Sequence, residues 1–145
     1  MADQDTINRV LKGQIYSGAK VKVPVVTLDG VLAGRAPKLI KIDTEGFETE
    51  VLRGAVHTLE NPELKAVLLE LNGSGEAYGF DEQAVHCNLI ELGFKKCAYN
   101  LLTREIRVDA NEISNTGNDL YVRNPESVQD LLNSAKRYSV IDMQI

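Results

Sequence analysis

The chain is poor in cysteine and carries no excess of basic residues. Its 145 residues include two cysteines, and 16 lysines and arginines are outnumbered by 21 aspartates and glutamates, which gives a net charge of −5. Cys87 and Cys97 lack CxxC spacing, so we expect two reduced, buried thiols, with a single disulfide as the alternative. The negative charge argues against a nucleic-acid or anionic-membrane surface, because both need clustered lysine and arginine.

Long apolar runs are missing as well. No segment reaches the ~18 consecutive apolar residues that span a bilayer. The opening segment, Met1–Thr6, is polar and acidic, unlike the apolar core of a signal peptide. We therefore expect a cytoplasmic protein without a membrane partner. Its length suits a single domain over residues 1–145.

From Lys38 onward, short apolar runs alternate with segments of helical periodicity. This alternation predicts an α/β fold with a mostly parallel sheet in a core at residues 38–123. Residues 1–37 should form a short helix, then an edge strand or linker containing Pro24, then a turn at Asp29-Gly30. Residues 124–145 should form a C-terminal helix that starts at Pro125. Within the core we expect strands at 38–43, 65–71, 94–102 and 118–123, and helices at 47–59 and 82–92.

Several sequence blocks follow one another in a specific order. The run LIKIDTEGFE at residues 39–48 is followed by VLRGA at 51–55, with VTLD at 26–29 before it and LLELN at 68–72 and NDLYV at 118–122 after it. In content and order these blocks resemble the FkbM family of S-adenosylmethionine-dependent methyltransferases. The resemblance runs, with gaps, from about Val25 to about Arg123.

The resemblance implies the Rossmann-like fold of class I methyltransferases, with strand order 3-2-1-4-5-7-6 and strand 7 antiparallel. The four expected strands would be strands 4, 5, 6 and 7 in chain order, and strands 1 to 3 have no counterpart. The chain is thus similar to the C-terminal half of the family, a partial fold lacking the N-terminal strands that grip S-adenosyl-L-methionine. That cofactor is implied by the family, and its site would be completed by a homodimer or by a separate chain that extends the sheet.

Acidic residues stand where two neighbouring strands of the predicted sheet end. Asp43 and Glu70 close their strands, and Glu45 and Asn72 lie two residues further on. Ligands of open α/β sheets bind beyond the carboxyl ends of the strands. A methyl acceptor must be held in line and relieved of a proton, which a carboxylate can do. We expect Asp43 to be a general base or hydroxyl anchor, Glu45 to share the catalytic site, and Glu70 and Asn72 to orient the substrate.

Other interpretations of these residues stay open. Glu45 could stabilise the first turn of a helix capped by Thr44, and Asp43 and Glu70 could be solvated strand ends. The acids could also bind Mg²⁺ or Mn²⁺, although no histidine stands beside them. Gly73-x-Gly75 follows a strand and precedes a helix, so it could bind phosphate, although its spacing departs from GxGxxG.

Three functions follow from these patterns. The first is a methyltransferase that acts on a hydroxyl group of a sugar or secondary metabolite, with its cofactor site completed by dimerisation or a partner chain. The second is a non-catalytic ligand-binding or protein-interaction module derived from that fold. The third is a metal-dependent hydrolase built on the acidic cluster. The resemblance favours the first, and the missing glycine-rich turn favours the second.

Overall fold

The computed structural model describes residues 23–109, 117–140 and 143–144. The elements follow in the order α1 (Leu28–Leu32), β1 (Leu39–Ile42), α2 (Glu48–Arg53), α3 (Val56–Glu60), β2 (Ala66–Leu71), the 3₁₀ helix η1 (Ser74–Tyr78), α4 (Glu82–Glu91), β3 (Phe94–Asn100), β4 (Glu105–Val108), β5 (Gly117–Arg123), α5 (Pro125–Ser134), β6 (Ser139–Val140) and β7 (Met143–Gln144). They form an α/β fold.

Five strands form one mixed sheet in the order β1-β2-β5-β3-β4. Only β1 and β2 pair in parallel; β5 runs against both β2 and β3, and β4 runs against β3. The expectation of a mostly parallel sheet is therefore wrong. Parallel neighbours need a crossover connection of about a dozen residues or more, whereas β4 follows β3 after the short turn at 101–104 and must fold back on it.

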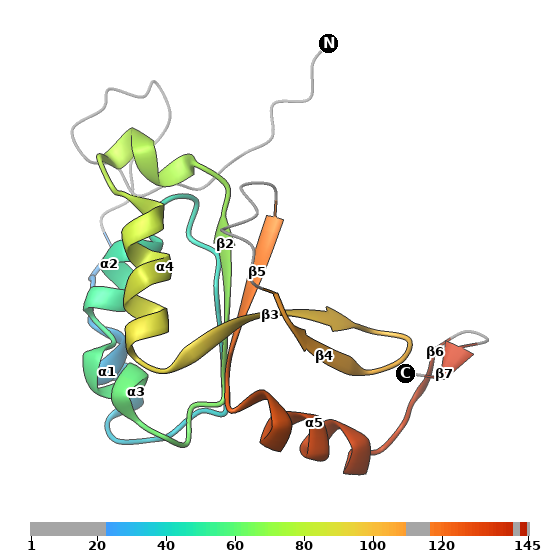
Figure 1. Ribbon diagram of the computed structural model, residues 1–145. Coiled ribbons are helices and arrows are strands. Elements are labelled where there is room, and N and C mark those ends of the chain that lie inside the picture. The colour runs from blue at the N-terminus through green and yellow to red at the C-terminus, as the bar shows by residue number, and fades with distance from the viewer. Residues whose placement is uncertain (1–22, 110–116, 141–142, 145) are drawn as a thin grey trace.

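One face of the sheet is covered by helices and holds the core. Figure 1 shows α1 to α4 on the same side of β1, β2 and β5. Alternate residues of β2 point into this layer, as the buried side chains of Val67, Leu69 and Leu71 show. The remaining buried apolar residues of the cluster are Ile42, Leu52, Ala55, Leu59, Leu64, Val85, Leu89, Phe94 and Tyr121.

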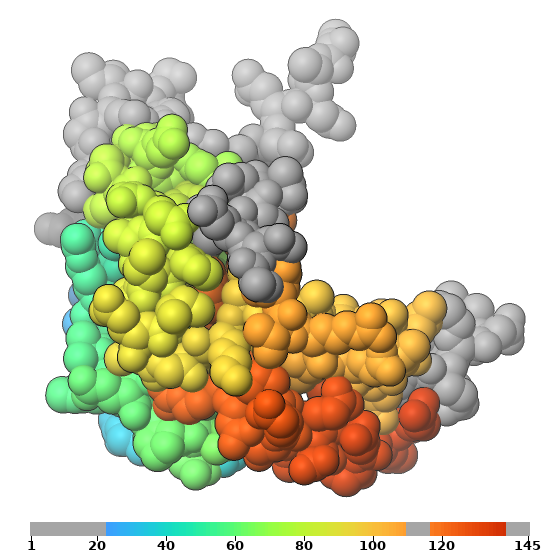
Figure 2. Space-filling view, in the orientation of Figure 1, coloured from blue at the N-terminus to red at the C-terminus, as the bar shows by residue number. Residues whose placement is uncertain are grey.

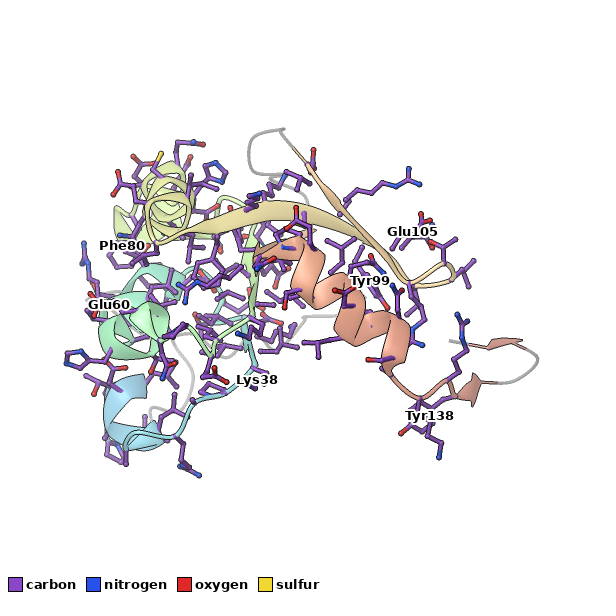
Figure 3. The ribbon with its side chains drawn as sticks, turned by 60° about the horizontal axis from the view of Figure 1, so that its bottom comes forward. Lys38, Glu60, Phe80, Tyr99, Glu105 and Tyr138 are labelled. Carbon is purple, nitrogen blue, oxygen red and sulfur yellow. The ribbon has the colours of Figure 1, made fainter. Side chains whose placement is uncertain are left out.

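The hairpin of β3 and β4 forms an arm together with α5. In Figures 1 and 2 this arm extends from the body of the molecule, away from the side on which α1 to α4 lie. Figure 3 places Tyr99 and Glu105 on the arm and Phe80 and Glu60 on the helical side. Gln129 of α5 fastens the arm, because its side chain accepts a hydrogen bond from Ile106 N at 2.8 Å and donates one to Arg104 O at 3.0 Å.

The expected helix at 47–59 is two helices, α2 and α3, separated by Gly54 and Ala55. A Cβ on Gly54 would lie 3.3 Å from the backbone and side chain of Thr27, so the preceding segment packs closely against the break. Asp29 then accepts hydrogen bonds from the first backbone N–H groups of α3, those of His57 and Thr58, and so starts the second helix. Long-range contacts decide this break.

Other boundaries also differ from the sequence prediction. The expected turn at Asp29-Gly30 lies inside α1, which Thr27 caps through a bond from Gly30 N. The described part of the expected edge strand, residues 23–27, is irregular, and the expected helix near the N-terminus lies outside the described residues. The last helix ends at Ser134, and β4 was not predicted.

Both cysteine thiols are free, as predicted. Cys97 is buried, as predicted, but Cys87 is exposed, contrary to the prediction. Across the described ranges, no helix has the length and apolar character needed to span a bilayer.

Candidate functional site

Asp43 and Glu70 lie opposite each other at the carboxyl ends of β1 and β2. The parallel register pairs Ile42 with Leu69, which brings the next residue of each strand together. The side chains of Asp43 and Glu70 are hydrogen-bonded to each other, and Lys41 Nζ forms an ion pair with Asp43. Two carboxyl groups can bond in this way only when one of them carries a proton. The structure thus joins the two acids, and their catalytic role stays a prediction.

The shared hydrogen bond gives the two carboxyl groups opposite properties. The pKa of Asp43 is lowered because its carboxylate accepts hydrogen bonds from Lys41 and from Glu70. The pKa of Glu70 is raised, first by its hydrogen bond to Asp43, then by partial burial and by the negative charges of Asp43 and Glu45. Of the two groups, Glu70 therefore takes up a proton first as the pH falls, and Asp43 stays ionised to lower pH.

The pair lies at the surface of the sheet. The side chains of Lys41 and Asp43 are 49% and 38% exposed. A cavity of about 400 Å³ lies between α2, α3 and α4, and one of about 610 Å³ lies between residues 25–28 and α2, but neither is lined by Asp43 or Glu70. The common pocket expected at the strand tips is neither of these two cavities, and the Asp43 side chain at the tips is partly exposed to solvent.

Glu45 does not begin a helix. Its backbone is left-handed, with φ of 56°, and so is that of Gly46, with φ of 96°. Helix α2 starts later, after Phe47, and has no side-chain cap. The alternative role for Thr44 and Glu45 at a helix start is therefore wrong. The left-handed turn keeps Glu45 close enough to Glu70 for its charge to raise the pKa of that carboxyl group.

Asn72 links the pair to the loop after β2. Its side-chain nitrogen lies 3.4 Å from Glu70 Oε1, and its side-chain oxygen accepts a hydrogen bond from Ser74 N at 3.0 Å. The second bond fixes the orientation of the amide, so that the nitrogen faces the carboxyl group. Asn72 thus joins Asp43, Glu45 and Glu70, and all four residues expected at the site lie in one cluster.

The glycine turn after β2 is closed to an anionic ligand. Gly73 N donates to Glu82 Oε2 and Gly75 N donates to Glu82 Oε1, each at 3.0 Å. A phosphate group would need these same N–H groups. The carboxylate of Glu82, which is 8% exposed, already occupies their donor positions. The phosphate-binding alternative is therefore not supported.

Glu48 is a site residue that the sequence analysis missed. Its side chain is 2% exposed, and its Oε1 atom accepts hydrogen bonds from Thr44 N at 2.7 Å and Thr44 Oγ1 at 2.9 Å. The second oxygen, Oε2, is buried and has no hydrogen-bond partner among the described residues. Glu48 falls within the LIKIDTEGFE block, and the available signal was an acid placed among residues expected to face the core.

An aromatic cluster flanks the loops. Phe47 packs edge to face on Tyr78 and Phe80, with ring centres 5.6 and 5.9 Å apart, and Tyr78 stacks on Phe80 at 6.1 Å. The guanidinium of Arg53 lies 5.8 Å from the centre of the Phe80 ring. Because these three rings pack on one another, the cluster connects the loop after β1 to the segment after β2.

The model of the methyltransferase FkbM domain matches residues 4–114, which is most of the chain. The chain belongs to the FkbM methyltransferase family. The resemblance found in the sequence ran from Val25 to Arg123, whereas the family match starts before Val25 and stops before Arg123. Strand β5 therefore lies outside the match. No curated protein and no solved structure is significantly similar to this FkbM chain.

Residues of the family blocks also shape the fold of this FkbM chain. Asp29 of VTLD caps α3, and hydrogen bonds from Thr58 Oγ1 and from two backbone N–H groups lower its pKa. Gly46 permits the left-handed turn of LIKIDTEGFE. Within the described segments, no group of three or more histidine, cysteine, aspartate or glutamate side chains has the arrangement of a metal site.

Proposed function

We propose that Asp43 and Glu70 form the acceptor side of a methyltransferase site and act on a hydroxyl group of a sugar or secondary metabolite. Membership of the FkbM family gives the chain a methyltransferase-like function. The observation that supports the finer proposal is the pair of carboxyl groups, with pKa values shifted in opposite directions, at the ends of adjacent parallel strands. A pair of carboxyl groups with separated pKa values is typical of acid–base chemistry.

In this proposal the ionised carboxylate of Asp43 accepts a hydrogen bond from the substrate hydroxyl and takes up its proton as the oxygen reacts. Glu70 keeps Asp43 oriented, and the amide of Asn72, fixed by Ser74, and the carboxylate of Glu45 bind further hydroxyl groups of the acceptor. Lys41 limits the negative charge of the group through its ion pair with Asp43. When bound, S-adenosylmethionine supplies the methyl group in this family.

The residues described by the structure do not fit that cofactor. The Gly73-x-Gly75 turn, which follows β2 and precedes α4, has both of its glycine N–H groups bonded to Glu82. Asp43 and Glu70, the acids at the ends of the parallel strands, are bonded to each other. We therefore infer that S-adenosylmethionine is held by residues outside the described ranges or by another chain.

The edge of the sheet offers a place for such a contribution. Strand β1 ends the sheet, with no neighbour on its outer side among the described strands, and Leu39 on it is 57% exposed. An open edge beside apolar side chains favours the addition of a further strand. We propose that a second copy of the chain, as a homodimer, or a separate chain extends the sheet there and encloses the partly exposed carboxylate pair.

The test has a binding part and a catalytic part. Thermal-shift measurements with millimolar S-adenosylmethionine and S-adenosylhomocysteine report cofactor binding by the chain, and gel filtration reports its oligomeric state. Transfer of a labelled methyl group to sugar and polyol acceptors is then compared between the wild type, Asp43→Asn and Glu60→Gln, whose residue is exposed and ends α3 on the helical side of the sheet (Figure 3). Asp43→Asn should lose about 100-fold or more in turnover, and Glu60→Gln should lose nothing. Full activity of Asp43→Asn would contradict the proposal.

A second candidate is a non-catalytic ligand-binding or interaction module. It is favoured by the partial exposure of the Asp43 side chain and by the absence of a fitting cofactor turn in the described part. A folded chain that shows no thermal shift with either cofactor form, under all oligomeric conditions tested, would favour this candidate.

A further inference from the structure

Two buried glutamates hold the two loops that carry the carboxylate pair. Glu48 accepts both hydrogen bonds of Thr44, the residue next to Asp43, on a single oxygen atom. Glu82 accepts the N–H groups of Gly73 and Gly75 on separate oxygen atoms. Both glutamates are more than nine-tenths buried, and these hydrogen bonds connect them to loop residues. Each carboxyl group thus fixes the backbone of one loop from the core side.

The two loops are also locked to each other. A Cβ on Gly46 would lie 2.5 Å from Ser74 O, a distance that only a glycine permits. Ser74 N in turn holds Asn72, whose amide faces Glu70. The contacts therefore close a ring that runs from Asp43 through Gly46, Ser74 and Asn72 to Glu70 and back across the shared hydrogen bond.

The turn within this ring is strained. A residue with a side chain in the left-handed region costs roughly 1–2 kcal/mol, and Glu45 adopts that conformation with φ of 56°. Such strain persists only where the surroundings impose it, and it clusters at functional sites. Here Glu48 fixes the residue before Glu45, and the contact of Gly46 with Ser74 fixes the residue after it.

Glu48 makes both of its bonds to Thr44 with one of its two carboxyl oxygens. Its other oxygen, Oε2, is buried and has no hydrogen-bond partner among the described residues, and a buried acceptor left unpaired costs about 1–3 kcal/mol. We propose that Glu48 and Glu82 are positioning residues that keep the carboxyl groups of Asp43 and Glu70 in contact, an inference that rests on the proposed function for its catalytic meaning.

The different bonding of the two glutamates gives a sharp test by rescue. Alanine at position 48 or 82 removes the carboxyl group that accepts the hydrogen bonds of the corresponding loop. Glutamine at position 48 retains one oxygen, which is enough for both bonds of Thr44. Glutamine at position 82 retains only one of the two acceptors and turns its NH₂ group toward the other N–H group. Glu48→Gln should therefore behave like the wild type, and Glu82→Gln should behave like Glu82→Ala.

The readout is the titration of the Asp43 and Glu70 carboxyl carbons by ¹³C NMR in the 145-residue chain. The separation between the two apparent pKa values should narrow in Glu48→Ala, Glu82→Ala and Glu82→Gln, and should be retained in Glu48→Gln and in the control Glu60→Gln. Turnover, where measured, should fall about tenfold in the three affected variants, because the reacting groups are displaced.

A milder variant protects the test against unfolding. Thr44→Val removes the hydroxyl hydrogen bond to Glu48 but keeps the backbone N–H bond. It should narrow the separation between the two apparent pKa values less than Glu48→Ala does. An unchanged separation in Glu82→Gln and Thr44→Val would overturn the positioning role, even if both variants were less stable. Failure of the proposed function is recognised separately, because in that case Asp43→Asn keeps its turnover whatever the titrations show.

Discussion

Asp43 and Glu70 meet from neighbouring parallel strands and share one hydrogen bond between their carboxyl groups. This contact links folding to pH in two opposite ways. The lowered pKa of Asp43 contributes stability that is present above its ordinary value of 3.8 and is lost as the pH falls through the folded value. The raised pKa of Glu70 contributes stability that is complete below its ordinary value of 4.5 and is lost as the pH rises through the folded value.

Glu70→Gln should therefore gain stability over the wild type as the pH rises from about 4 to about 7. Glutamine resembles the protonated carboxyl group but cannot be forced to ionise beside Asp43. The gain should stay below about 1 kcal/mol, because the pair is partly exposed and screened by solvent. Urea unfolding of the wild type and Glu70→Gln at about pH 4 and about pH 7 measures this gain in stability, with Glu60→Gln as the control. An equal stability difference at the two pH values would contradict the raised pKa of Glu70.

The parallel meeting of the acids could be predicted from the sequence, because local patterns specify it. Apolar runs that end in Asp43 and Glu70 fix two strands, and an intervening helical segment sets them parallel. The start of α4 at Asp81 and that of α5 at Pro125 were predicted for the same local reason, since capping side chains and proline act within one turn.

The remaining features depend on contacts between distant segments. The left-handed backbone of Glu45 reflects Gly46 packed on Ser74, 28 residues further along the chain. The break between α2 and α3 reflects Asp29 and Thr27, which precede β1. The buried positions of Glu48 and Glu82 follow from backbone N–H groups that only the folded loops present. Periodicity carries no information on such partners.

Gly46→Ala should separate the two loops of the site. Its Cβ would lie 2.5 Å from Ser74 O at a φ of 96°, so the variant meets both a backbone clash and left-handed strain. We expect a loss of about 3 kcal/mol or more in the free energy of unfolding. Gly34→Ala is the matched control, because Gly34 has φ of 84° with nothing within 4 Å of the added Cβ. That variant should lose only the strain term of about 1 kcal/mol. Equal losses would contradict the close packing of the loops.

Arg123→Met should loosen the helical layer from the sheet. The guanidinium of Arg123 donates to the carbonyl oxygens of Leu59, Asn61 and Leu92 at 2.7 to 3.0 Å and lies 4.3 Å from the centre of the Phe94 ring. Methionine leaves three carbonyl groups at the ends of α3 and α4 without this donor, and we expect a loss of about 3 kcal/mol by chemical denaturation.

Arg35→Met is the control for this loss. Arg35 also donates to two carbonyl oxygens, those of Val31 and Leu32, but these bonds are exposed and water can replace them. Its loss should stay within about 0.5 kcal/mol. If the two arginine variants were equally stable, the three carbonyl bonds of Arg123 would have no measurable value.

Gln129→Ala should open the outer edge of β4 to association. Strand β4 ends the sheet, and the amide of Gln129 pairs with it as a neighbouring strand would, by accepting from Ile106 N and donating to Arg104 O. Alanine leaves both groups unpaired beside the exposed side chain of Val108, which is a template for pairing with another chain. We expect a loss of about 1–2 kcal/mol in stability and additional, larger species in light scattering as concentration rises. Asn133→Ala is the control, because it removes only the bond of Gln129 Nε2 to Asn133 and leaves the bonds to β4 in place. If Gln129→Ala matched the wild type in size distribution at every concentration, the edge would be protected by something other than this amide.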